Sequence, residues 1–437
     1  MYFATIKKSL LDYLLFIGYL ILFAWLVTKI RFFNSVGLSN PQLVILLLVK
    51  VMAGIFYGWM GLYYGNLAQM LDTWSYHQMG VVEYHLLWSN PHEYFTNIFY
   101  TPYPHGYENF FGSVDSYWND LKGNIFVKLL SLFDILSFGH YYVNVIFYSF
   151  ISMFGPIALY RVMTDIFPTK KVVILLTSFF IPSFLYWTSG IHKEGLIFLG
   201  ISLIIYHLYF GWKEQHYPVK RWLGILLGIL ILFILRNFLM LLVVPAVFAW
   251  LLACRRPRYG LVIFTAIYLS FGALFFLARY INERFDFPQA VVEKQQAFLQ
   301  MQGGNSTIPI KELKPTFKSF LKNTPQAVSL SFLRPYPADV QNLLSLVACI
   351  EINLLLFLFV LYLLFRKKNG LFPKNAIYLC IFLSFSILLA IGFSINNLGA
   401  MVRYRSIIIP LLMIPVVAQI DWQRIFHLLP GKIKPAT

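Results

Sequence analysis

Charged residues are scarce in this sequence of 437 residues. They make up 12% of the chain, whereas a typical soluble domain carries about 25%. Hydrophobic residues make up 59%, and the mean hydropathy is +0.68. Runs of about 20 apolar residues, long enough to cross a hydrocarbon core of roughly 30 Å, recur along the whole chain. The composition excludes a soluble protein and predicts an all-α, polytopic membrane protein.

Cysteine and several diagnostic motifs are also lacking. Cys254, Cys349 and Cys380 lie far apart, within or beside apolar stretches, so they offer neither metal-ligand spacing nor a disulfide framework. A Gly-rich phosphate loop and a paired Asp-x-Asp motif are missing, which gives no indication of a nucleotide site. No repeat, low-complexity segment or metal-ligand cluster is evident. We therefore expect one integral-membrane domain over residues 1–437 and predict no metal site, although a divalent metal cofactor stays open.

Basic residues outnumber acidic ones, with a net charge of +17. They cluster in short loops between apolar stretches, as the positive-inside rule predicts, so we expect no nucleic-acid partner. The clusters are Arg161 with Lys170 and Lys171; Lys213 with Lys220 and Arg221; Arg255, Arg256 and Arg258; Arg366, Lys367, Lys368 and Lys374; and Arg424, Lys432 and Lys434.

The apolar stretches predict about eleven spans. They are 10–30, 43–65, 141–161, 172–189, 194–211, 222–235, 238–253, 260–278, 341–365, 375–394 and 403–420. A turn is expected at Arg236–Asn237, because 222–253 as one helix would be near 48 Å long. With these spans all five basic clusters fall on the cytoplasmic side. The same parity puts residues 1–9 outside, despite Lys7 and Lys8, unless the stretch 125–138 crosses; we interpret that stretch as an interfacial or re-entrant helix.

Two long segments, 66–140 and 279–340, are predicted to be external. The first holds seven acidic residues, two basic residues and five of the nine histidines, among many Tyr, Trp and Pro residues. Long connecting segments in compact proteins are either functional or disordered. The aromatic content favours an ordered segment with interfacial helices, since Trp and Tyr concentrate at membrane surfaces.

The stretch "PSFLYWTSGIHKEGLIF" (182–198) places three ionisable side chains, His192, Lys193 and Glu194, at an outer turn between two spans. Thr188 or Ser189 could cap the helix that follows. The free N–H groups and dipole of that helix would attract an anion, and Lys193 would strengthen the attraction. This predicts a phosphate or pyrophosphate subsite. The alternative is that Lys193 and Glu194 pair at the membrane surface.

Further cations lie at outer turns, against the positive-inside bias. Arg236 follows a span, Arg334 lies in "FLRPYP", and Arg403 and Arg405 lie in "NNLGAMVRYRSIIIPLL". Arginine suits phosphate because its planar fork binds two oxygens at once. We predict that these four and Lys193 converge on an anionic ligand. The spacing of Arg403 and Arg405 does not share one helix face, and one of them is expected in an unwound segment after Gly399.

Acidic residues supply candidate proton acceptors. Asp72 follows the second span, with Tyr76 and His77 one helical turn further on, and Asp115 lies in the same external segment. A carboxylate near cations at a membrane surface can act as a general base; the alternative for each is an ordinary solvated charge. Glu351 falls within a span, where an acid is either functional or paired with a polar group of a neighbouring span.

Together "PSFLYWTSGIHKEGL", "FLRPYP" and "NNLGAMVRYRSIIIPLL" resemble segments of bacterial membrane proteins of polysaccharide assembly. These are glycosyltransferases of the C-type superfamily and O-antigen-polymerase-like proteins. The first resemblance implies an external-loop acid, a polyprenyl-phosphate-linked donor and attack by an acceptor hydroxyl. Asp72 takes that position, although Thr73 follows it where the superfamily often has a second acid. The second resemblance implies that Arg236, Arg334, Arg403 and Arg405 hold lipid-pyrophosphate saccharides.

These expectations combine into one function. We expect a glycosyltransferase of the bacterial cytoplasmic (inner) membrane with its site facing outward. Its partners would be a polyprenyl-linked sugar donor, a glycan or lipid-linked acceptor, and membrane lipids. Asp72 and Glu194 are the expected catalytic groups, with His192 and the five cations on the donor phosphate and Tyr76, His77 and Asp115 on the sugar. The cations would stabilise the leaving phosphate, often the largest catalytic contribution.

Two other classes of function stay open. A transporter of a lipid-linked or anionic substrate would use broken helices and charged sites near the bilayer midplane, and Glu351 is the residue that suits it. A non-catalytic scaffold would leave the outer cations without a role.

Overall fold

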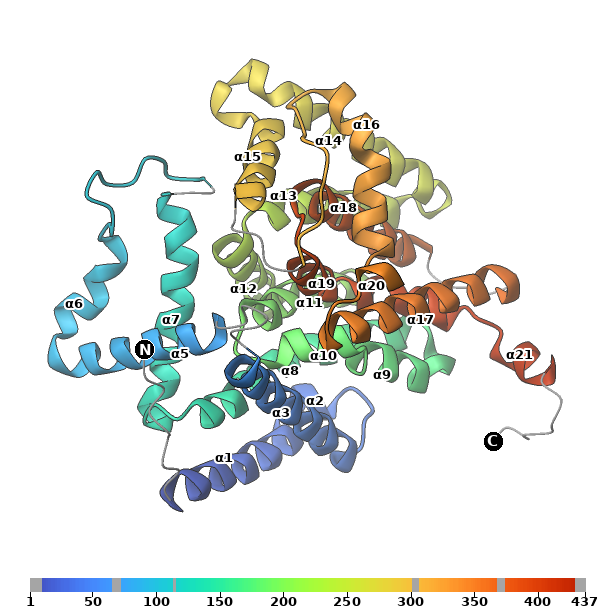
Figure 1. The fold of residues 1–437 in the computed structure, drawn as a ribbon. Helices are drawn as coiled ribbons and strands as arrows, with labels where there is room; N and C mark the ends of the chain where they lie inside the picture. Colours follow the sequence, from blue (N-terminus) through green and yellow to red (C-terminus); the bar gives the residue numbers. More distant parts are fainter. Residues whose placement is uncertain (1–9, 65–71, 113–114, 301–305, 368–373, 429–437) are drawn as a thin grey trace. The chain divides into compact units, whose positions relative to one another are not determined.

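The computed structural model describes residues 10–64, 72–112, 115–300, 306–367 and 374–428, and these are mostly helical (Figure 1). Within these ranges there is no strand, and the three β-bridges are isolated: Asn109 with Ser116, Thr307 with Asn397, and Arg366 with Ile420. The expected all-α class is confirmed.

Eight helices in the described ranges are long and apolar enough to cross a membrane, and the number is ten if each of two bent pairs forms one span. The eight are α1 (Leu10–Lys29), α3 (Asn40–Tyr63), α8 (Tyr141–Ile166), α11 (Lys193–Glu214), α13 (Phe238–Arg255), α14 (Gly260–Ile281), α17 (Leu343–Phe365) and α18 (Lys374–Ser394). The bent pairs are α9 (Lys171–Phe179) with α10 (Pro182–Ser189), and α19 (Leu398–Ser406) with α20 (Ile409–Ala418). The protein is thus a polytopic helical membrane protein.

The helix α12 (Val219–Arg236) explains why the described residues hold at most ten candidate spans, whereas the sequence predicts eleven. It covers the expected span 222–235, but its 18 residues include Lys220, Arg221 and Arg236, which leaves too little uninterrupted apolar length. Its end at Arg236 and the start of α13 at Phe238 lie where the sequence predicts a turn.

The chain packs as two compact units. Unit 1 comprises residues 1–161 and 185–237, and unit 2 comprises residues 162–184 and 238–437. Each unit has its own set of packed helices and its own group of buried charges.

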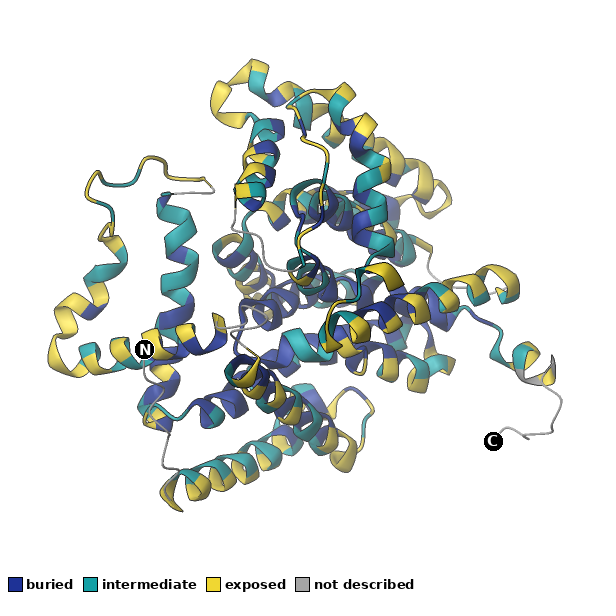
Figure 2. Cartoon of the chain, viewed as in Figure 1, coloured by how far each residue is buried: buried dark blue, intermediate teal, exposed yellow. Residues whose placement is uncertain are grey.

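In unit 1, α11 is a largely enclosed helix. Most of its residues are buried, whereas Val27 is the one buried residue of α1 (Figure 2). The exposed apolar faces suit contact with lipid. A Cβ atom on Gly228 of α12 would lie 2.7 Å from the carbonyl oxygen of Gly200 on α11. Glycine therefore permits the close packing of these two helices, which carries Arg236 toward the start of α11.

In unit 1, the segment that is predicted to be external is helical over most of its described residues. It contains α5 (Asp72–Ser89), α6 (Pro91–Thr96) and α7 (Tyr117–Ser137), and a short helix, α2 (Arg31–Asn34), lies earlier in the unit. Lys128 of α7 pairs with Glu83 of α5 at 2.5 Å. Asp134 of α7 is buried and accepts a hydrogen bond from Asn144 at 2.6 Å; burial raises its pKa, against the effect of its hydrogen bonds. The stretch 125–138 is thus part of a helix outside the candidate spans, and its interfacial position stays a prediction.

In unit 2, the second segment that is predicted to be external also contains helices in its described residues. It contains α15 (Phe287–Gln300), α16 (Phe317–Val328), and the π-helical turn η5 (Ser329–Leu333). A small core of Val292, Leu313 and Phe320 holds α15 and α16 together. The last helix in the described part of the unit is α21 (Trp422–Leu428).

Candidate functional site

The turn between α10 and α11 is held by a buried lysine. Lys50 of α3 is 2% exposed, and its ammonium group donates to the Thr188 carbonyl at 2.8 Å and to Ser189 Oγ at 3.2 Å. An ammonium inside an apolar span needs such oxygen partners. The expectation that Thr188 or Ser189 caps α11 is wrong: His192 takes the N-cap position, without a side-chain cap bond, and both hydroxyls face Lys50.

Gly190 allows this turn to lie against α3. A Cβ atom at Gly190 would lie 2.1 Å from the ring of Tyr57. Tyr148 of α8 donates a short hydrogen bond from its hydroxyl group to the His192 carbonyl on the other side of the turn. The turn is therefore fixed from two helices, and the His192 side chain is fixed with it.

His192 stands between two carboxylates. Its Nδ1 atom contacts Glu194 Oε2 in a short hydrogen bond, and its Nε2 atom lies 3.6 Å from Asp72 Oδ2. Both ring nitrogens thus face a carboxylate oxygen, that of Glu194 within hydrogen-bond distance and that of Asp72 just beyond it. The rings of Tyr57, Tyr76 and Trp187 approach the imidazole edge-on.

Arg236 completes the chain of ions. Its Nη2 atom donates to Glu194 Oε1 at 2.8 Å, so each oxygen of Glu194 has a partner. Glu194 is 0% exposed and Arg236 is 10% exposed, whereas the Asp72 side chain is 51% exposed. The series Asp72–His192–Glu194–Arg236, which we call the His192 cluster, therefore runs from a solvent-accessible carboxylate to a buried ion pair.

The helix α5 brings Asp72 and Tyr76 to this cluster. The Trp74 indole N–H donates to the Gly58 carbonyl at 2.8 Å, and Thr73 shares a hydrogen bond with Tyr141 at 2.7 Å. These contacts fix α5 against α3 and α8. Lys193 lies with its ammonium nitrogen 4.8 Å from the centre of the Tyr76 ring. Asp72, Tyr76, His192, Lys193, Glu194 and Arg236 are thus gathered in unit 1.

His77 faces a different environment from Tyr76. Its ring packs edge-on against Trp74 and Tyr141, and it is 6% exposed. Burial lowers the pKa of His77 to about 4, opposed by a hydrogen bond with the Gly139 backbone and assisted by His140. His77 is thus placed as a buried neutral side chain, and its expected contact with a sugar stays a prediction.

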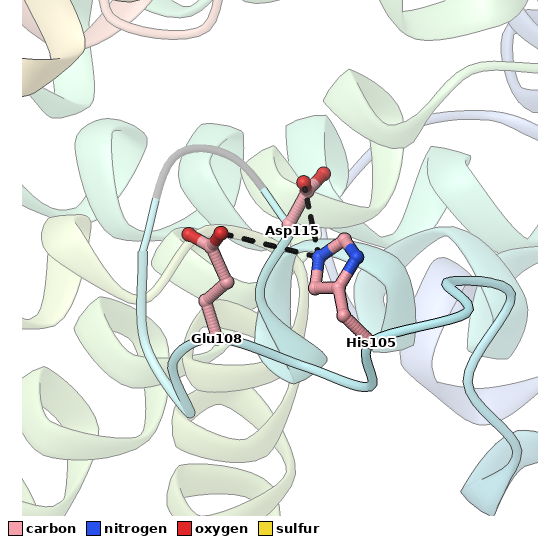
Figure 3. A group of neighbouring side chains, drawn as sticks. All are labelled: His105, Glu108 and Asp115. Atoms are coloured by element: carbon pink, nitrogen blue, oxygen red, sulfur yellow. Dashed lines mark ion pairs between the residues drawn. The ribbon is translucent and has the colours of Figure 1, made fainter.

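Asp115 takes part in a separate group. His105 Nε2 lies 3.8 Å from Asp115 Oδ2 and 3.9 Å from Glu108 Oε1 (Figure 3). One ligand atom from each residue lies within 4.8 Å of the others, so a divalent cation could be held there. His105 and Glu108 are exposed, which also suits a protonated histidine between two carboxylates. The sequence does not predict this group, because His105 and Glu108 are not adjacent to Asp115 in the chain.

The remaining predicted arginines belong to unit 2. Arg334 follows η5 and pairs with Asp339 at 3.2 Å. Arg405 is 1% exposed and donates to the backbone carbonyls of Ser331, at 3.5 Å, and Arg334. Arg403 is half-buried and its guanidinium lies 5.0 Å from the ring of Tyr404. As the spacing indicates, Arg403 and Arg405 have different surroundings. Convergence of all five outer cations on one ligand stays a prediction.

The segment that carries Arg403 and Arg405 is helical, although the sequence predicts an unwound segment after Gly399. Asn397 caps α19 by accepting a hydrogen bond from the Ala400 N–H at 3.0 Å, so the helix begins before Gly399. The irregular residues come later, at 407–408, where α19 and α20 meet at 60°. Both arginines therefore project from a short helix ahead of the break.

Glu351 is paired within unit 2. Its two carboxylate oxygens accept hydrogen bonds from the Ser183 backbone N–H and hydroxyl group, each at 2.6 Å. Ser183 is the second residue of α10, just after the break from α9. The carboxylate thus serves as a cap for free N–H groups at a helix start, which is the pairing that the sequence leaves open.

Comparisons with protein-family models, with curated proteins and with solved structures found no match for this chain. No family is therefore assigned. The findings establish a polytopic helical membrane protein with eight to ten candidate spans.

Proposed function

We propose that this protein is a membrane glycosyltransferase or polymerase for cell-surface glycan assembly. It would use a saccharide donor linked to polyprenyl phosphate or pyrophosphate at the outer face of the cytoplasmic membrane. The observation that carries the proposal is the His192 cluster, in which a half-exposed carboxylate is backed by a buried histidine and ion pair. Such a series positions a general base at the edge of apolar spans.

The proposed reaction is a displacement at the anomeric carbon. The acceptor hydroxyl gives its proton to Asp72 as its oxygen forms a bond to that carbon. The bond between the anomeric carbon and the phosphate oxygen breaks, and its electron pair stays on the phosphate. Lys193, next to His192, offsets the charge of the leaving group. His192 orients Asp72 through the 3.6 Å contact.

Glu194 receives a different role from the one that the sequence suggests. Because it is fully buried and both oxygens face His192 and Arg236, it is a positioning residue for the imidazole. Arg236 then offsets the Glu194 charge. In unit 2, Arg403 is the arginine that we propose for contact with a lipid-linked phosphate, since Arg405 already binds backbone carbonyls.

The test is the fate of lipid-linked saccharides in cells. A host strain whose chromosomal gene carries Asp72→Asn should accumulate the polyprenyl-linked donor, measured by mass spectrometry of extracted lipids. Glu93→Gln, the same carboxylate-to-amide change at an exposed acid of α6, is the matched control and should behave as the parent. Normal donor levels in the Asp72→Asn strain, with the protein present in the membrane, would contradict the proposal.

A transporter is the second candidate, and the two bent helix pairs favour it, since transporters bind substrates at broken helices. The two candidates differ in covalent chemistry. A transporter moves the lipid-linked saccharide across a vesicle membrane unchanged, whereas the transferase releases polyprenyl phosphate or pyrophosphate. Mass spectrometry of the lipids in proteoliposomes distinguishes them.

A further inference from the structure

Unit 2 contains a groove of about 940 Å³ between α9, α17 and α20. Its walls are almost wholly apolar. Along α17 they include Val347, Ile350, Leu354, Leu355 and Leu358, which lie on one face of the helix. Such a surface excludes a polar solute and suits a hydrocarbon chain.

The groove is open at the surface of unit 2. Val172 and Leu176 on α9 are 70% and 53% exposed, and Ile350 and Leu354 on α17 are 60% and 55% exposed. Both helices belong to candidate spans. Exposed apolar side chains on spans meet the bilayer interior, so the groove is accessible to lipid from the side.

The depth of the groove matches one leaflet. From Val347 to Leu358, α17 advances by roughly 16 Å at 1.5 Å per residue. A hydrocarbon core of about 30 Å has leaflets of roughly half that depth. Acyl chains end near the midplane, so they fit this depth, whereas a polyprenyl chain is longer than one leaflet.

Lysines lie at one end. Lys170 and Lys171, at the start of α9, are lining residues, and Lys367 and Asp421 lie close enough to Lys170 to interact with it electrostatically. The end therefore carries three cations and one acid. Deeper in the groove, Glu351 is satisfied by Ser183 at the break between α9 and α10. The polarity is thus that of a lipid, with a headgroup at the lysines and tails along α17.

We propose that this groove binds an anionic phospholipid, with its phosphate at Lys170 and Lys171 and its acyl chains against α9, α17 and α20. Basic pockets between membrane helices bind anionic headgroups in this way. A zwitterionic lipid would bring its own ammonium group to the lysines. The inference is independent of the proposed function, because it uses no residue of the His192 cluster.

Native mass spectrometry of the purified full-length protein tests the inference. The probe is an equimolar mixture of phosphatidylglycerol and phosphatidylcholine in detergent micelles. Phosphatidylglycerol should be retained preferentially. The double variant Lys170→Gln/Lys171→Gln should lower its retention roughly 30-fold, because each lysine contributes about 1 kcal/mol to the binding of an anionic headgroup. The control is Lys318→Gln/Lys322→Gln on α16, where both lysines are exposed; it should retain the lipid like the parent.

A second variant tests the binding of the acyl chains without altering the charge of the groove. Leu354→Trp fills the groove from an exposed position and should reduce retention, while Leu363→Trp, on the same helix beyond the lining residues, should not. The melting temperature should be unchanged in both. Equal retention of the two lipids, full retention by the Lys170→Gln/Lys171→Gln variant, or preferential retention of added polyprenyl phosphate would overturn the inference.

Discussion

The two groups of buried charges in this protein pair with different partners. In unit 1, His192, Glu194 and Arg236 pair with one another through side chains, and the series reaches solvent at Asp72. In unit 2, the buried Arg405 pairs with backbone carbonyls of the segment that follows α16, and Arg403 beside it is less buried.

This difference separates functional from structural roles. A series of titratable side chains with one exposed end can take up and release a proton. A guanidinium bound to carbonyl oxygens cannot, because arginine stays charged and carbonyls do not titrate. We therefore propose proton transfer for unit 1 and, in unit 2, a structural role for Arg405, which binds backbone carbonyls, and a ligand-binding role for Arg403, which is less buried.

The first prediction has a yes-or-no outcome and concerns the side of the membrane on which the two groups of buried charges lie. Both should be external, since the basic clusters of the short loops fall on the other side. In a Cys254→Ser background, single cysteines at Glu108 and Lys318 should react with a membrane-impermeant reagent in intact cells, and cysteines at Gln215 and Arg256 should not. Labelling at Arg256 would overturn the topology. The labelling of Gln215 and Arg256 also decides whether α12 crosses the membrane. If both positions are on the same side and α13 crosses, α12 must cross as well.

The largest energetic effect is expected at Arg405. Arg405→Ala leaves the carbonyls of Ser331 and Arg334 without this donor and leaves Glu351 without the charge that faces it. Leaving buried hydrogen-bonding groups without their partner costs about 1–3 kcal/mol, and more where a charge is involved. The variant should lose its folded fraction in size-exclusion chromatography and melt at lower temperature. Arg403→Ala, two residues away and less buried, is the control and should lower the melting temperature less. Equal melting of both variants would remove the distinction between the two arginines.

Sequence patterns were sufficient for the membrane class and for eight of the eleven predicted spans, or ten if each bent pair forms one span, because apolar length is a local property. They also placed Asp72, His192, Glu194 and Arg236 at one face, where the structure joins them. Lys50 could have been singled out, since it stands alone within an apolar stretch, where a charge needs a partner. Its partners, Thr188 and Ser189, lie far along the chain, and no local pattern predicts them.

A second effect, on turnover rather than on folding, is expected at Arg403. Arg403→Ala should lower the release of polyprenyl phosphate by about 10²–10³-fold, as for loss of one preorganised charge-stabilising group. Arg403→Lys should restore it only partly, because an ammonium lacks the planar fork. Arg284→Ala, at an exposed arginine of the segment 279–340 in the same unit, serves as the control. Turnover of Arg403→Ala equal to that of Arg284→Ala would assign Arg403 to structure alone.

A smaller effect is expected at Lys193 in unit 1. A hydrogen bond to a charged group contributes about 1.5–3 kcal/mol, so Lys193→Ala should lower turnover at least about tenfold. Lys193→Arg should retain more activity, because the positive charge and the contact with the Tyr76 ring are kept. The same assay in proteoliposomes measures both. If Lys193→Ala were as active as the parent, Lys193 would be an interfacial anchor.

The arrangement of α19 was beyond sequence analysis for a physical reason. Gly399 suggests an unwound segment, but the cap from Asn397 outweighs the low helix propensity of glycine. Likewise, the contrast between Tyr76 and His77 depends on which face of α5 meets α8, and that face is fixed by Thr73 and Trp74. Tertiary contacts decided both cases.

The most direct test of the central claim is the turnover of purified protein in proteoliposomes that contain polyprenyl-linked saccharides extracted from host membranes. Asp72 is half exposed, so Asp72→Asn should fold and melt like the parent. Removing a general base lowers the rate about 10²–10⁴-fold, so release of polyprenyl phosphate or pyrophosphate by Asp72→Asn should fall by that factor, while Glu93→Gln should turn over like the parent. Parental turnover by a folded Asp72→Asn protein would contradict the account.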